Sequence, residues 1–161
     1  MDYSTFIEHL ELRLEAMTPD DLLRFGLEIC KTLYADYAAF SRKHHWGDPD
    51  LLLDAIATCE RSLHSAPDQE LVLALRSRID AIIPDTEDFG DHDGSSALNA
   101  SAAVACVLQY VLDKDAKNIR DAATLYYDNI DFKLQESRVL GEDALANHPM
   151  MEEARRFLLG E

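Results

Sequence analysis

Apolar residues recur every three or four positions along most of the chain, which is the pattern of amphipathic helices. Between residues 18 and 45, for example, one apolar stripe consists of Leu23, Leu27, Cys30, Tyr34 and Tyr37. The same spacing predicts further helices near residues 4–16, 49–63, 68–82, 96–112 and 115–137, a weak helix at 142–146, and a last helix from residue 149. No segment alternates apolar and polar residues for long enough to predict a strand.

Capping residues indicate where several of these helices begin. Thr18 and Asp48 each precede a proline, and this order favours an N-cap followed by the first helical residue. We expect Ser95 or Ser96 to cap the fifth helix and Asn147 to cap the last one. The segment 84–94, which begins at a proline and contains two glycines, is predicted to be a loop.

The fifth predicted helix differs from the others because it is apolar on nearly every side. The stretch 102–108 contains no polar residue, and four alanines lie between positions 100 and 105. Such a helix is typical of a protein interior, and at this length it is too short for a membrane span. We therefore predict an all-α fold in which residues 1–161 form a single-domain bundle of six or seven helices around a central, Ala-rich helix.

The charge of the chain narrows the classes of partner. Its 161 residues include 31 acidic and 15 basic side chains, so the formal net charge is −16. Phosphate backbones and anionic membranes repel such a surface, and we expect neither a nucleic-acid nor a membrane partner. The charge is explained either by solubility or by attraction toward a basic protein partner.

The cysteines and the N-terminal segment indicate the cellular compartment of the protein. Cys30, Cys59 and Cys106 are widely spaced, form no metal-binding pair and fall on apolar helical faces, which is typical of buried, reduced thiols. The first residues have neither the basic nor the apolar region of a secretory signal. A soluble protein of the cytoplasm is the expectation.

The loop at 84–94 is the first candidate site. Its acids could form a solvated loop, a surface for a partner, or a site for a divalent cation, although their spacing does not match an EF-hand. The aromatic residue among them either anchors the loop inward or contacts a partner. The candidate interaction surface is Asp85, Glu87, Asp88, Phe89, Asp91 and Asp93.

A second candidate is the segment from His44 to Asp48, which would add imidazoles to the acidic loop if the two segments meet in space. Adjacent histidines on a helix point in different directions, so we predict no metal-ligand set there. A small-molecule pocket between the second and sixth helices is a further alternative to plain core packing. Its candidate residues are Tyr34, Tyr37, Trp46 and Tyr126.

Motifs of known enzyme classes are missing from the chain. There is no H-E-x-x-H, no G-x-S-x-G, no Walker loop and no G-x-G-x-x-G. We therefore assign no catalytic residue and no cofactor, and the sequence favours a protein that is not an enzyme.

Three segments resemble a known family in their order along the chain. They are residues 29–40 followed by Trp46-Gly47-Asp48, the Ile-Pro-Asp-Thr-Glu-Asp-Phe joint at 83–89 before the Ala-rich helix, and Asn147 to Glu153. Together they resemble the YjaG-like bacterial proteins, a domain-of-unknown-function family (number four-sixteen). The resemblance implies an all-α fold and supplies no activity and no catalytic residues.

Two function hypotheses follow. The first is a non-enzymatic interaction protein that uses an acidic helical surface, in the manner of an immunity or inhibitor protein toward a basic partner. An exposed apolar face on the last helix would also allow a homodimer. The alternative is an enzyme or binding protein that depends on a divalent metal or a small ligand and is centred on the acidic loop.

Overall fold

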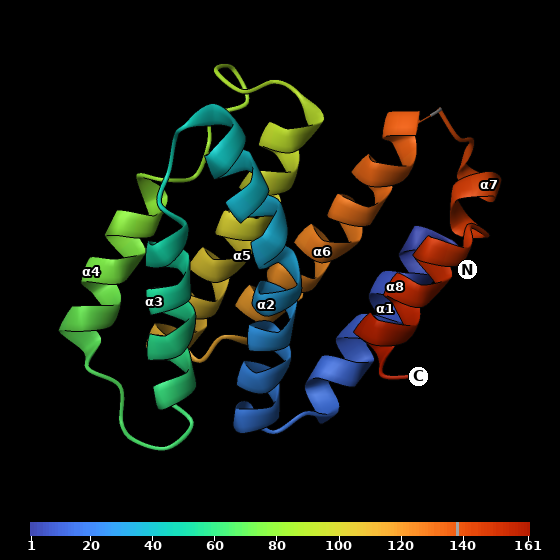
Figure 1. Ribbon diagram of the computed structural model, residues 1–161. Coiled ribbons are helices and arrows are strands. Elements are labelled where there is room, and N and C mark those ends of the chain that lie inside the picture. The colour runs from blue at the N-terminus through green and yellow to red at the C-terminus, as the bar shows by residue number, and fades with distance from the viewer. Residues whose placement is uncertain (138) are drawn as a thin grey trace.

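The predicted helices all form. The computed structural model describes residues 1–137 and 139–161 and contains no strand among them. Its helices are α1 (Tyr3–Ala16), α2 (Pro19–His44), α3 (Pro49–Arg61), α4 (Gln69–Asp80), α5 (His92–Asp113), α6 (Ala116–Ser137), α7 (Glu142–Ala146) and α8 (Pro149–Leu159). The all-α prediction is confirmed, with the weak segment at 142–146 as a short helix of its own (Figure 1).

Helix starts agree with the sequence at two predicted caps. The Thr18 hydroxyl accepts a hydrogen bond from the backbone N–H of Asp21 at 3.2 Å. The Asp48 carboxylate accepts one from the N–H of Leu51 at 3.1 Å. In both helices proline occupies the first turn, where its missing N–H costs no hydrogen bond.

Two other predicted caps are wrong. Helix α5 begins at His92, so Ser95 and Ser96 lie inside it and Asp91 caps it. A carboxylate at that position satisfies a free N–H and also complements the positive end of the helix dipole, which a serine hydroxyl does not. Helix α8 is capped by the His148 ring, not by Asn147.

Helix α5 occupies the centre of the bundle, where it contacts α2, α3, α4 and α6. Its small residues Ala97, Ala100 and Ala103 are at most 1% exposed and let the neighbouring helices approach closely. By length and hydropathy alone, α5 would fit a membrane span, and 67% of that apolar window is buried inside the protein. The core position of α5 accounts for its composition.

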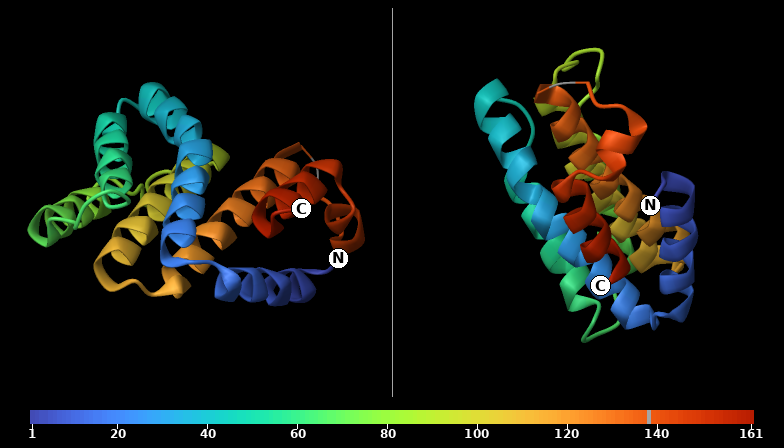
Figure 2. Two further views of the ribbon diagram at one scale, coloured as in Figure 1. Left: turned by 90° about the horizontal axis from the view of Figure 1, so that it is seen from below. Right: turned by 90° about the vertical axis from the view of Figure 1, so that its right-hand side faces the viewer.

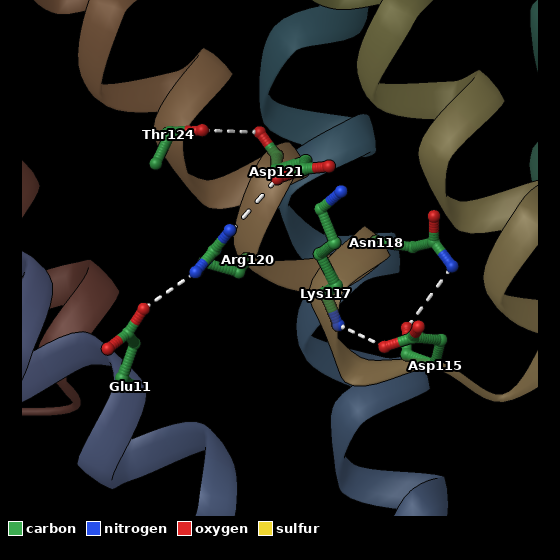
Figure 3. Close-up of polar contacts among 7 residues, drawn as sticks. All are labelled: Glu11, Asp115, Lys117, Asn118, Arg120, Asp121 and Thr124. Carbon is green, nitrogen blue, oxygen red and sulfur yellow. Dashed lines mark hydrogen bonds and ion pairs between the residues drawn. The ribbon is translucent and has the colours of Figure 1, made fainter.

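The first and last helices pack mainly on α6 and not on α5. Helices α1 and α8 pack on α6 and on each other, on the side of α6 away from α3 and α4 (Figures 1 and 2). The Arg120 guanidinium of α6 pairs with Glu11 of α1 at 2.7 Å, at the contact between these two helices (Figure 3). Helix α6 is therefore the second organising element, because it carries contacts on both sides.

Candidate functional site

The acidic loop lies against the C-terminal end of α2, at the top of Figure 1. The Phe89 ring packs against the rings of Phe40, His44 and Trp46, with centroid distances of 5.0, 5.3 and 5.2 Å. The two segments singled out in the sequence therefore meet in space. Phe89 is half-buried and packs inward, so it fixes the loop to α2.

The first turn of α5 fits closely under the same loop. A Cβ atom on Gly94 would lie 2.0 Å from the Phe89 carbonyl oxygen, so only glycine is accommodated there without moving the backbone. The Asp91 carboxylate accepts a hydrogen bond from the Gly94 N–H at 2.8 Å. The loop end and the helix start thus form one fixed unit.

The carboxylates of the loop divide into two groups. Asp93 pairs with the ammonium group of Lys43, and Asp91 lies 4.0 Å from the same nitrogen. The pKa of Lys43 is raised, chiefly by its hydrogen bond to Asp93 and the charge of that carboxylate. The other group is exposed and has no cation partner in the described part of the chain: Asp85, Glu87 and Asp88.

The inner group forms a set of possible metal ligands with α2. One donor atom each from His44, Asp91 and Asp93 lies within 4.8 Å of the others. The His44 Nε2 atom is 3.7 Å from the Asp91 carboxylate, is buried, and has no hydrogen-bond partner. Sequence spacing predicted no such set, because the histidine and the two acids come from different elements that only the fold brings together.

A cavity of about 170 Å³ adjoins this set, between α2, α5 and α6. It is lined by Asp36 and Lys133 as well as by Lys43 and Asp93. The Asp36 carboxylate accepts hydrogen bonds from Lys133 and from the buried amide of Asn129, both at 2.9 Å. No sequence pattern singles out Asp36, Asn129 and Lys133, since they are single polar residues on otherwise ordinary amphipathic helices.

The predicted aromatic pocket is not assembled as one cavity. Tyr37 is fully buried and fills the core beside Phe40, and Tyr126 packs on Phe157 of α8 at 5.1 Å. Tyr34 instead lines an open groove between α2 and α3. The group fails as a pocket because Tyr126 faces α8, which the periodicity of α6 alone could not reveal.

The three cysteines are poor nucleophiles. Burial raises the pKa of Cys59 to about 12 and that of Cys106 to about 11, and it raises the pKa of Cys30 as well. The thiols are unpaired. Cys30 and Cys59 are buried, as predicted, whereas Cys106 is partly buried. Because the reactive species is the thiolate, the raised pKa values make all three thiols unreactive near neutral pH.

Comparison with known proteins bears on the family and the fold. A crystal structure of a DUF416 family protein from Shewanella baltica OS155 superposes with a TM-score of 0.79 at 23% sequence identity, covering 92% of this chain and 80% of that one. No curated protein matches the chain. The family model described as "Protein of unknown function (DUF416)" matches residues 9–159. The chain therefore belongs to the DUF416 family of proteins of unknown function.

Proposed function

We propose that this protein is a non-enzymatic binding protein whose acidic loop engages a basic protein partner, as an immunity or inhibitor protein does. The observation that carries the proposal is the outer group of carboxylates. Asp85, Glu87 and Asp88 are exposed on a loop that Phe89 holds in place. A loop that is already ordered favours binding, because no free energy is lost in ordering it when the partner binds.

The net charge of −16 supports the same proposal. Complementary charge steers a basic partner toward the surface and speeds association at low ionic strength. The free thiols are in keeping with a reducing compartment, and we place the interaction in the cytoplasm on that ground.

The test compares two variants of equal charge. The loop variant carries Asp85→Asn, Glu87→Gln and Asp88→Asn, and the control carries Glu8→Gln, Glu15→Gln and Glu152→Gln at exposed helix positions. Three neutralisations change the formal charge from −16 to −13 in each. The native chain and both variants are used as bait in lysate of the parent cell at low salt. Any captured protein is then purified and titrated against each of the three.

We expect the native chain and the control to bind the same basic protein and the loop variant to lose at least about tenfold in affinity, or about 1.4 kcal/mol. The association rate should fall as salt rises. Equal binding by the loop variant and the control would show that the position of these acids is irrelevant and would refute the proposal.

A divalent cation at His44, Asp91 and Asp93 is a second candidate function, favoured by the buried, unpartnered Nε2 of His44. Imidazole with carboxylates suits Zn²⁺ or Mn²⁺, and a bound ion would stabilise the folded chain by mass action. Lys43 competes for the same acids, so Lys43→Gln should strengthen binding and His44→Gln should weaken it.

The cation test uses the melting temperature with and without Zn²⁺, Mn²⁺, Mg²⁺ or Ca²⁺. The variant Asp91→Asn keeps a capping side chain on α5 and removes one charged ligand, which separates loss of the helix cap from loss of the ion. If no cation raises the melting temperature of either the native chain or Lys43→Gln, this candidate is eliminated.

A further inference from the structure

A groove between α2 and α3 is independent of the acidic loop and of the function proposed for it. We infer that this α2–α3 groove, lined by Arg24, Lys31 and Tyr34 of α2 and by Leu53, Ile56, Glu60 and Arg61 of α3, binds a small organic anion with an apolar body. The inference rests on its size, its charge and the order of polar and apolar residues along it.

The groove consists of two adjoining cavities. The larger has a volume of about 620 Å³, and the smaller, of about 300 Å³, shares Lys31, Ala57 and Glu60 with it. Volumes in this range suit small-molecule ligands. The distance along α2 from Arg24 to Tyr34 is about 15 Å at the helical rise per residue, so an extended ligand would fit lengthwise.

Charge in the larger cavity is reversed relative to the chain as a whole. The chain has 31 acidic and 15 basic residues, whereas this cavity is lined by three basic residues and His64 against two glutamates. The basic residues are Arg24, Lys31 and Arg61. In a protein of net charge −16, an anion therefore finds here a local surface that does not repel it.

Two of these cations make only weak interactions within the protein. Arg61 donates to the neutral hydroxyl of Thr58 at 2.9 Å and has no carboxylate partner in the described residues. Arg24 lies 3.5 Å from Asp21, with both side chains more than half exposed, and exposed pairs of this kind contribute little. Both guanidiniums are consequently available to an anionic head group, for which their planar donors are well suited.

The smaller cavity provides an apolar counterpart. Tyr34 and Ile56 line it, together with Leu53, which is 44% exposed. An ion pair between Lys31 and Glu60 lies where the two cavities join. Because Lys31 and Glu60 pair with each other, the groove changes from a net cationic end at Arg24 and Arg61 to a neutral end at Tyr34 and Leu53. A ligand with an anionic head and an apolar tail matches both ends.

The experiment titrates decanoate, decanol and acetate separately into the full chain by calorimetry, below the micelle concentration. We expect decanoate to bind at least about tenfold more tightly than decanol, which lacks the charge, or acetate, which lacks the tail. Decanol binding as tightly as decanoate, or no decanoate binding at millimolar concentration, would overturn the inference.

Matched variants locate the binding. Arg24→Gln with Arg61→Gln should weaken decanoate at least about tenfold, whereas Arg42→Gln with Arg78→Gln, which changes the net charge equally at exposed positions elsewhere, should not. Leu53→Ser should weaken it, and Leu73→Ser on α4 should not. Equal effects of the groove and control variants would contradict the site.

Sedimentation velocity of the native chain and of Leu53→Ser tests whether a second copy of the chain occupies the groove instead. A monomer in both cases supports a small ligand. A dimer that dissociates on Leu53→Ser would identify the groove as a contact between two copies and would overturn the small-ligand inference.

Discussion

At the residue scale, Tyr37 joins three parts of the chain. Its hydroxyl donates to the carbonyl of Ile82, just after α4, at 2.8 Å, and accepts from the backbone N–H of Asp48 at 3.3 Å. Asp48 in turn caps α3. One hydroxyl therefore links α2 to the segment after α4 and to the start of α3.

Removing that hydroxyl should be costly. We expect Tyr37→Phe to lower the free energy of unfolding by about 1–3 kcal/mol, because the part-buried Ile82 carbonyl and Asp48 N–H lose their partner. Urea denaturation measures the loss. Tyr34→Phe, at the half-exposed groove, is the control and should change stability by less than about 0.5 kcal/mol. Equal effects of the two variants would show that the Tyr37 hydroxyl has no structural role.

A buried phenol and a partly buried thiol make the stability of the fold depend on pH. The pKa of Cys106 rises from an ordinary 9.0 to about 11, and that of Tyr37 from 10.0 to about 12, in each case chiefly through burial. The unfolded chain releases these protons first, so the folded state binds more protons in this range. Their stabilising contribution is complete below about pH 9 and is lost as the pH rises toward 12.

We therefore expect the free energy of unfolding to fall between pH 9 and 12 in urea titrations. Cys106→Ala should make the fall shallower between about pH 9 and 11, and Tyr37→Phe should do so between about pH 10 and 12. Each variant serves as the control for the other. Curves parallel to that of the native protein in both variants would rule out these two groups as the cause.

At the element scale, the close packing of α2 on α5 and α6 depends on one glycine. A Cβ atom on Gly26 would lie 2.8 Å from the Ile119 Cδ1 and 2.9 Å from the Val107 Cγ2. Both of these side chains are at most 1% exposed and lie in the core. The absence of a side chain at Gly26 therefore sets the distance between three helices.

We predict that Gly26→Val destabilises the protein by about 3 kcal/mol, since overpacking of a filled core typically costs 1–3 kcal/mol and valine adds three carbons here. Thermal and urea denaturation both report the change. Ala35→Val, on the exposed face of the same helix, tests helix propensity alone and should cost less than about 1 kcal/mol. A Gly26→Val protein as stable as Ala35→Val would mean that the helices can move apart freely.

At the scale of the whole molecule, the excess of acids opposes folding. Ion pairs such as Lys31–Glu60 and Glu11–Arg120 join the described helices, but their side chains are partly exposed and such pairs contribute little. Repulsion among the remaining acids is long-ranged and is screened by salt. Stability should therefore depend on ionic strength through the net charge and not through single contacts.

We expect the melting temperature to rise as NaCl increases from about 10 mM to about 200 mM, where the Debye length shortens from about 30 Å to below 10 Å. The charge-matched control variant with Glu8→Gln, Glu15→Gln and Glu152→Gln should show a smaller rise, because it starts from −13. Calorimetry at each salt concentration makes the comparison. A melting temperature that falls with salt in the native chain would indicate that its ion pairs outweigh its repulsion.

Part of this architecture follows from the sequence alone. Hydrophobic periodicity is a local property, so it located the helices, and the apolar composition of residues 97–112 was enough to place α5 in the core. Thr18-Pro19 and Asp48-Pro49 fixed two helix starts for the same reason. Caps were mistaken at α5 and α8, where several residues compete for the same local role.

Only the tertiary structure decided which distant residues meet. The joining of His44 to Asp91 and Asp93, and of Asp36 to Lys133, depends on how α2 lies across α5 and α6. The sequence leaves that crossing open, because amphipathic faces specify burial without specifying a partner. The close approach of helices at Gly26 and the packing of Phe89 on α2 favour one arrangement of these helices. Side chains in a core must fit their neighbours closely, and hydrophobic periodicity does not specify that fit.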